Sequence, residues 1–110
     1  MSLRKLEAYT APNGRKPFEE CTEALPEEVK ARIDAYVERV RGGAARRNVR
    51  RLKGAGGISE IRIDTGPGYR VYFGGGGDTL VLLDGGTKRT QEQDIDKAEQ
   101  YWRAYHETIV

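Results

Sequence analysis

Four basic side chains occupy positions in this chain that are suited to phosphate chemistry. Arg62 and Arg70 each lie between two apolar or aromatic residues in segments where polar and apolar residues alternate. Lys88 and Arg89 follow a Gly-Gly-Thr sequence. A guanidinium group holds phosphate oxygens through parallel hydrogen bonds, and an ammonium group can donate a proton. Because the sequence has one cysteine and one histidine, we expect no internal disulfide, no metal site and no Ser-His-Asp triad. The chemistry that these residues favour is charge stabilisation and proton transfer by cations.

A second group of cations lies in one acid-free stretch, which we call the basic segment. From Arg39 to Ser59 there are seven basic residues and no acidic one, whereas acids gather between Glu19 and Glu28. Two interpretations remain open: a solvated face, or an electrostatic footprint for a phosphate backbone or an acidic protein partner. The cations of the basic segment are Arg39, Arg41, Arg46, Arg47, Arg50, Arg51 and Lys53.

Length and composition set the class of protein. With 110 residues and a net charge of +2, the chain is long enough for one domain, which we expect to span residues 1–110. The first residues lack the apolar run of a signal peptide, and no segment has the length needed to cross a bilayer. We therefore expect a cytoplasmic protein with no membrane association and no cofactor.

Periodicity and turn residues predict an α+β fold with an N-terminal strand, two helices, a three-stranded antiparallel meander and a C-terminal helix. Pro17 and Pro26 each suit the first turn of a helix, and Thr90 with Gln93 has the spacing of a capping box before the last helix. The basic segment has no clear period and is interpreted as a connection. The predicted strands are 6–9, 58–64, 69–74 and 79–84, and the predicted helices are 17–25, 26–41 and 91–107.

Alternation assigns the residues of the meander to two faces. The predicted core face holds Ile61, Ile63, Tyr69, Val71, Phe73, Val81 and Leu83. The opposite face holds Glu60, Arg62, Asp64, Arg70, Tyr72, Leu80 and Leu82. Depending on register, Arg70 lies opposite Arg62, which indicates an anion site, or opposite Asp64, which indicates a structural ion pair.

The order of these elements, together with the motifs of the meander, resembles the RelE/ParE toxin superfamily. Within it the resemblance is closest to HigB-like proteins described as addiction module killer proteins, and it covers nearly the whole chain. The segments that carry it are Glu60–Ile63, Gly66–Phe73 and Gly85–Lys88, followed by Gln91, Asp94, Ile95, Lys97 and Ala98.

The resemblance implies the toxin of a bacterial type II toxin–antitoxin pair with a RelE-like fold. Such toxins are commonly ribosome-dependent endoribonucleases that cut translated messenger RNA without a metal and are neutralised by a protein antitoxin, through which we expect oligomerisation. Because ParE members of this fold poison DNA gyrase, a non-enzymatic gyrase inhibitor remains an alternative. An inactive homologue that only binds its antitoxin is another.

The resemblance also assigns roles to particular residues. Arg70 is expected to stabilise the transition state. Lys88 is expected either to protonate the leaving oxygen or only to flank the start of the last helix. Arg62 is expected to hold a neighbouring phosphate, to lower the pKa of a lysine, or to be an ordinary exposed strand residue. A strand tyrosine such as Tyr72 packs under a helix more often than it stacks on a base, and Glu60 is either a base or the partner of Arg62. The predicted RNA-binding residues are Arg46, Arg47, Arg50, Arg51, Lys53, Tyr72 and Arg89.

This chain departs from the RelE pattern near its C-terminus. RelE ribonucleases have a tyrosine in the region that Gln93, Asp94 and Ile95 occupy here, and no aligned tyrosine replaces it. His106 lies where some HigB-type enzymes use histidine, but the surrounding residues do not match their motif. The predicted site is therefore one of cations from the strands and from the loop after the third strand of the meander.

Overall fold

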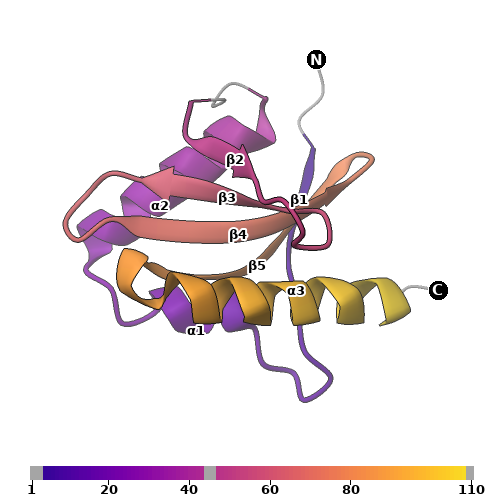
Figure 1. Ribbon diagram of the computed structural model, residues 1–110. Helices are drawn as coiled ribbons and strands as arrows, with labels where there is room; N and C mark the ends of the chain where they lie inside the picture. Colours follow the sequence, from indigo (N-terminus) through magenta and orange to yellow (C-terminus); the bar gives the residue numbers. More distant parts are fainter. Residues whose placement is uncertain (1–3, 44–46, 109–110) are drawn as a thin grey trace.

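The centre of the fold is a mixed five-stranded sheet (Figure 1). The structure is a computed structural model that describes residues 4–43 and 47–108. The strand order is β1-β5-β4-β3-β2, in which β1 is parallel to β5 and the other neighbours are antiparallel. The strands are β1 (Lys5–Ala8), β2 (Val49–Arg51), β3 (Ile58–Ile63), β4 (Tyr69–Gly76) and β5 (Thr79–Thr87).

Helices cover both faces of this sheet and create two apolar cores. In Figure 1, α3 (Gln91–Thr108) crosses in front of the strands, while α1 (Pro17–Thr22) and α2 (Glu27–Arg41) lie behind them. The core behind the sheet contains Phe18, Ile33, Val37, Val40, Ile61, Ile63, Val71, Phe73, Leu80 and Leu82. The core under α3 contains Tyr9, Ala55, Ile58, Tyr72, Val81, Leu83, Ala98 and Trp102. The predicted α+β class and its three-stranded meander are confirmed.

The strand β2 was not predicted. The sequence predicts a connection in the basic segment, yet Val49–Arg51 pair with β3, with Arg50 opposite Glu60 and Arg51 opposite Ser59. A strand of three residues is too short to show alternation, and two of its three residues are arginines, which are uninformative about strand formation. The sheet therefore gains an edge strand that carries part of the basic segment.

The predicted facing of β5 is wrong. Leu80 and Leu82 belong to the core behind the sheet, and Val81 and Leu83 belong to the core under α3. The register shifts between Tyr72 and Phe73, since Tyr72 lies opposite Asp84 while Phe73 lies opposite Leu82. Because both faces of the sheet are covered, all four residues of 80–83 are buried and their polarity does not alternate.

Two glycines allow α3 to lie close to the sheet. A Cβ atom at Gly74 would overlap the indole ring of Trp102, and one at Gly86 would overlap the Asp94 carboxylate and the Thr90 hydroxyl. The helix starts at Gln91, as predicted, but the capping box forms one turn earlier, around the 3₁₀ turn Lys88–Thr90. There the Thr87 N–H donates to Thr90 Oγ1, and the Thr90 hydroxyl donates to Asp94. The start of α3 is thus fixed against the end of β5.

Candidate functional site: cations around a buried carboxylate

A row of polar residues crosses four strands beneath the N-terminal half of α3. Arg50 of β2 lies opposite Glu60 of β3, which lies opposite Tyr72 of β4, which lies opposite Asp84 of β5. Glu60, Tyr72 and Asp84 are buried. Under the other half of the helix the sheet is apolar, with Trp102 packed against Gly74. The polar row therefore marks one end of the molecule as chemically distinct.

Glu60 is the centre of this end. Its side chain is 0% exposed, and Oε2 accepts a hydrogen bond of 2.8 Å from Nε2 of Gln91, the first residue of α3. Nη2 of Arg50 lies 3.5 Å from Oε1, and Nε of Arg70 lies 3.5 Å from Oε2. The expected partner Arg62 forms no ion pair with Glu60 or with any other residue that the structure describes. Glu60 is therefore enclosed by donors from β2, β4 and α3 and has no free face with which to act as a general base.

Arg62 lies directly opposite Arg70 on the adjacent strands β3 and β4. This is the register that the sequence analysis associated with an anion site, and the carboxylate partner of Arg70 is Glu60 rather than Asp64. Arg62 is exposed, whereas the Arg70 side chain is only 11% exposed. Two like charges side by side repel unless an anion or a carboxylate lies near them. Of these two arginines, only Arg70 lies close to the Glu60 carboxylate.

Lys88 and Arg89 follow the end of β5, next to this pair. Gly86 lies opposite Arg70, and Lys88 comes two residues later as the first residue of the 3₁₀ turn. Both basic side chains are exposed, and neither forms an ion pair within residues 4–43 and 47–108. The strand ends thus place Arg62, Arg70, Lys88 and Arg89 at one end of the sheet.

Tyr72 is 0% exposed and packs in the core under α3. Burial, followed by the negative charge of Glu60, raises the pKa of its hydroxyl far above the usual range. The buried hydroxyl lies beside the Glu60 carboxylate, which is its candidate acceptor, but no hydrogen bond of good geometry is formed among the described residues. Tyr72 is therefore not accessible for the predicted contact with RNA. The alternative, a tyrosine packed under a helix, is what the structure shows.

Asp84 is a buried carboxyl group that the sequence analysis did not select. It is 2% exposed, and burial and the negative charge of Asp94 raise its pKa to about 8, which Lys97 opposes. Its Oδ1 atom is buried without a hydrogen-bond partner among the described residues. The signal that could have identified it is its position directly after the apolar run Val81-Leu82-Leu83, which predicts a buried strand. A carboxylate that continues such a strand is notable, because carboxylates are rarely fully buried.

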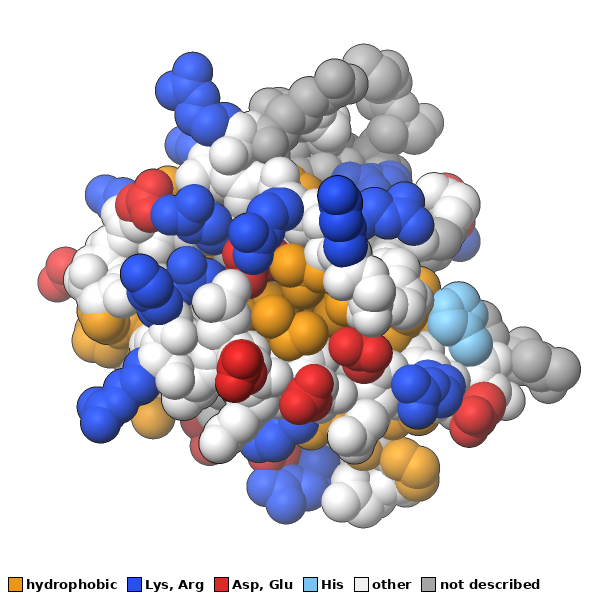
Figure 2. All heavy atoms as spheres, viewed as in Figure 1, with side chains coloured by type: hydrophobic (Ala, Val, Ile, Leu, Met, Phe, Trp, Pro, Cys, Tyr) orange, Lys and Arg blue, Asp and Glu red, His pale blue; other side chains and the backbone are white. Residues whose placement is uncertain are grey.

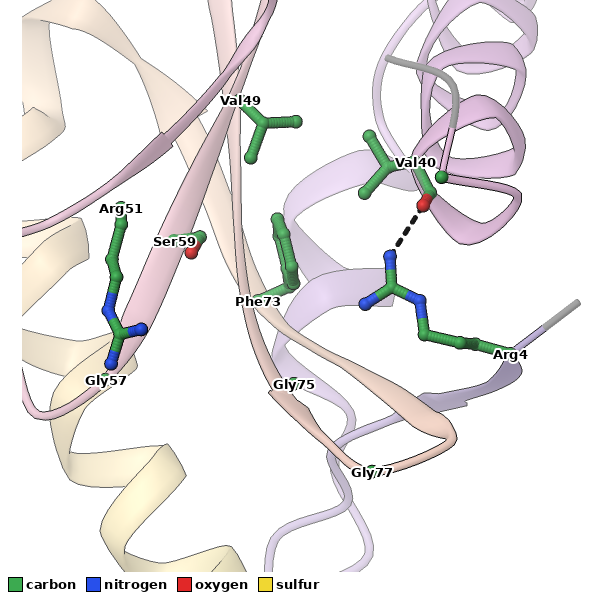
Figure 3. Close-up of a pocket in the computed structure, with 10 residues that line it drawn as sticks. Arg4, Val40, Val49, Arg51, Gly57, Ser59, Phe73, Gly75 and Gly77 are labelled. Carbon is green, nitrogen blue, oxygen red and sulfur yellow. Dashed lines mark hydrogen bonds between the residues drawn. The ribbon is translucent and has the colours of Figure 1, made fainter. Parts of the chain in front are cut away.

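The basic segment is divided between the two faces of the sheet. Arg50 faces the polar row, whereas Arg51 lines a pocket of about 420 Å³ behind the sheet together with Arg4, Ser59 and Phe73. Figure 3 shows Arg51 and Arg4 on opposite sides of this pocket with Phe73 between them, and Arg4 donates to the Val40 carbonyl. Arg51 also borders the groove beside α3, together with Arg50 and Lys53, so it lies at the edge between the two faces.

Other cations of the basic segment have local partners or separate positions. Arg39 lies over the ring of Tyr36, at 5.4 Å from its centroid, and Arg41 pairs with Glu38 at 3.2 Å. Arg47 and Lys53 are exposed, and Lys53 borders a groove of about 550 Å³ between β2 and α3. Arg46 lies outside the described residues. In Figure 2, basic side chains spread over the strands beside α3, with apolar atoms between them and the acidic side chains of the helix.

Comparison with known proteins places the chain in a family of toxin type. The family Phage derived protein Gp49-like (DUF891) matches residues 20–103, a range that includes all of β3, β4 and β5. An uncharacterized protein of Haemophilus influenzae is 43% identical over 72 residues, which is 64% of this chain and 69% of that protein. The chain belongs to the Gp49-like family. This family is associated with the toxins of toxin–antitoxin systems, and that association implies an antitoxin partner.

The described helices do not include one that is long and apolar enough to span a membrane.

Proposed function

We propose that this chain is the toxin of a type II toxin–antitoxin pair and acts as a metal-independent endoribonuclease on translated messenger RNA. The observation that carries the proposal is the position of Arg62 opposite Arg70, with Lys88 at the adjoining end of β5. A pair of guanidinium groups beside an exposed ammonium group matches the charge that develops when a phosphodiester is cleaved. Membership in the Gp49-like family supports the toxin class, and the RelE-like order of elements supports the RNA target.

The proposed reaction uses the RNA's own 2′-hydroxyl as nucleophile. The 2′-oxygen attacks the adjacent phosphorus, and the bond between phosphorus and the 5′-oxygen breaks. Arg62 and Arg70 hold the non-bridging oxygens, so positive charge is already in place as the phosphorane becomes more negative. The 2′-hydroxyl proton passes to solvent water, and the Lys88 ammonium group donates a proton to the departing 5′-oxygen. The products are a 2′,3′-cyclic phosphate and a 5′-hydroxyl.

The surrounding cations supply affinity for the strand. Arg89 is exposed beside Lys88, and Arg47, Arg50 and Lys53 extend positive charge from the site along β2 and its flanking loops. Contacts of this kind bind the RNA backbone without reading its sequence. We assign cleavage to the ribosome in the cytoplasm, where translated messages are found. A protein antitoxin that covered these cations would block access to RNA.

The test uses exposed residues, because Arg70 contacts a buried carboxylate and its removal also threatens folding. Lys88→Ala and Arg62→Ala are expressed from an inducible promoter, with Arg32→Ala as a matched control, since Arg32 is exposed on α2 behind the sheet. We expect the wild type and Arg32→Ala to arrest growth and to produce new 5′ ends within translated messages in primer extension. Lys88→Ala and Arg62→Ala should lose both effects at equal protein levels.

The alternatives give different results in the same experiment. A gyrase inhibitor would produce DNA damage with intact transcripts. An inactive homologue would arrest no growth and leave transcripts unchanged, while still binding its antitoxin. Either result from a stably expressed wild-type protein would reject the nuclease.

A further inference from the structure

We propose that Glu60 and Gln91 are positioning residues that fix the orientation of the Arg70 guanidinium, so that the first turn of α3 controls the geometry of the site. This inference rests on the proposed nuclease function for its catalytic meaning. Neither residue touches the reacting phosphate in this arrangement. Both act through Arg70.

The burial of Glu60 makes its orientation unusually well determined. A carboxylate with 0% exposure cannot turn toward solvent, so its direction is set by Gln91, Arg50 and Arg70. The contact from Gln91 is the shortest of the three, at 2.8 Å, and both it and the contact from Arg70 involve Oε2. A change at Gln91 therefore acts on the same oxygen that Arg70 faces.

The contact with Glu60 determines which nitrogens of Arg70 remain for a ligand. Nε is the nitrogen of Arg70 that lies nearest the carboxylate, at 3.5 Å, and it is buried without a hydrogen-bond acceptor of good geometry among the described residues. The two terminal nitrogens are then left to hold a phosphate through parallel hydrogen bonds. Without the carboxylate, repulsion from Arg62 on the neighbouring strand would turn the guanidinium away.

Gln91 connects this arrangement to the helix. It is the first residue of α3, directly after the 3₁₀ turn that holds Lys88, and it is half-buried. Through Gln91 the same short segment presents the proposed proton donor and fixes the carboxylate behind the proposed phosphate-binding arginine. Gln93, two residues further along the helix, is exposed and forms no hydrogen bond with a described residue, which makes it a matched control.

The kinetic test compares purified wild type, Gln91→Ala, Gln93→Ala and Glu60→Gln on the same translated message. We expect Gln91→Ala and Glu60→Gln to lower kcat about tenfold with KM changed by less than about twofold, because a misdirected Arg70 weakens only the transition state. Gln93→Ala should match the wild type. Thermal unfolding of each variant separates this effect from a loss of folded protein.

A double-mutant cycle identifies Arg70 as the residue through which Gln91 acts. In an Arg70→Gln background, Gln91→Ala should cause no further loss of kcat, because the group that it positions is absent. An additional loss of about tenfold in that background would overturn the proposal. Equal loss in Gln91→Ala and Gln93→Ala would overturn it as well.

A spectroscopic measurement keeps the inference independent of enzyme activity. The Nε–Hε signal of Arg70 in a ¹⁵N spectrum of the full chain should exchange slowly with water in the wild type. It should shift and exchange faster in Gln91→Ala but not in Gln93→Ala. A signal that is identical in Gln91→Ala and the wild type would overturn the positioning role. If the signal behaves as expected while the wild type cleaves no RNA, the nuclease function fails and the control of Arg70 by Glu60 and Gln91 stands.

Discussion

Arg50 and Arg51 are adjacent in the chain but lie on opposite faces of the sheet. Arg50 pairs with the buried Glu60 beneath α3, and Arg51 lines the pocket behind the sheet with Arg4 and Phe73. Alternation along β2 separates them, because successive side chains of a strand point to opposite faces. Of these two adjacent cations, only Arg50 contacts the buried carboxylate of the candidate site, while Arg51 borders both the pocket behind the sheet and the groove beside α3.

Replacement of these two arginines tests that separation. Arg50→Ala should lower the free energy of unfolding by about 0.5–1 kcal/mol, because Glu60 loses a partly exposed cation but keeps Arg70 and Gln91. Arg51→Ala should change it by less than about 0.5 kcal/mol, because Arg51 is exposed and forms no ion pair with a described residue. Urea unfolding at low ionic strength measures both values. Equal losses of unfolding free energy in the two variants would contradict the different contacts of Arg50 and Arg51.

The close approach of α3 to the sheet can be tested at Gly74 and Gly75. Gly74→Ala should lower the free energy of unfolding by about 1–3 kcal/mol, because the new Cβ overlaps the Trp102 ring and forces the helix away. Gly75→Ala is the matched control, since the nearest atom to its Cβ is the flexible Arg4 Nη1 at 3.7 Å. Thermal unfolding followed by tryptophan fluorescence compares them. If Gly74→Ala proved as stable as Gly75→Ala, the packing of Trp102 against this strand would be wrong.

Asp84 should make the protein less stable as the pH rises from about 4 to about 8. Its pKa is raised from 3.8 to about 8 in the folded chain, first by burial and then by Asp94. Between these values the native state keeps a proton that the unfolded state has lost, so stability falls with pH by at most about 1.4 kcal/mol per unit. Below this window, and above it, the contribution of Asp84 is constant.

The variant Asp84→Asn removes this titration. Its free energy of unfolding should therefore fall less steeply than that of the wild type between pH 4 and 8, and the variant should be the more stable of the two at pH 8. Chemical unfolding at several pH values gives the two slopes. Parallel slopes would show that Asp84 does not carry the raised pKa.

The salt dependence of RNA affinity tests the part that Arg62 plays in binding. In a Lys88→Ala background, in which we expect no cleavage, Arg62→Ala should reduce the slope of log affinity against log salt by about 0.7, the value for one lost contact to a single-stranded phosphate. Arg32→Ala in the same background should leave the slope unchanged. Filter binding of a single-stranded RNA at several salt concentrations measures it. An unchanged slope in Arg62→Ala would remove Arg62 from the RNA interface.

Local signals were sufficient to predict much of this fold. Pro17 and Pro26 marked the two helices behind the sheet, and Thr90 marked the start of the last helix at Gln91. These signals involve residues close together in the chain, so they do not depend on the final packing. The facing of β5 could not be predicted, because the register shift beside Tyr72 arises only when β4 and β5 pair.

The sequence was sufficient to predict the cations of the candidate site. It was not sufficient to predict the contacts that enclose Glu60. Alternation placed Arg62 and Arg70 on one face, and their mutual opposition was one of two registers that the sequence allowed. The enclosure of Glu60 depends on β2, which no local pattern indicated, and on Gln91, which is brought to β3 by the packing of α3. Long-range contacts of this kind leave no trace in a single sequence.

The end groups of cleaved messenger RNA test the central claim most directly. Purified wild-type protein is added to an in vitro translation mixture that contains a defined message, and the cuts and their end groups are mapped with the Lys88→Ala variant in parallel. We predict new cuts that carry 5′-hydroxyl and 2′,3′-cyclic phosphate ends and that are absent with Lys88→Ala. An intact message, or cuts with 5′-phosphate ends that persist in Lys88→Ala, would contradict the proposed chemistry of Arg62, Arg70 and Lys88.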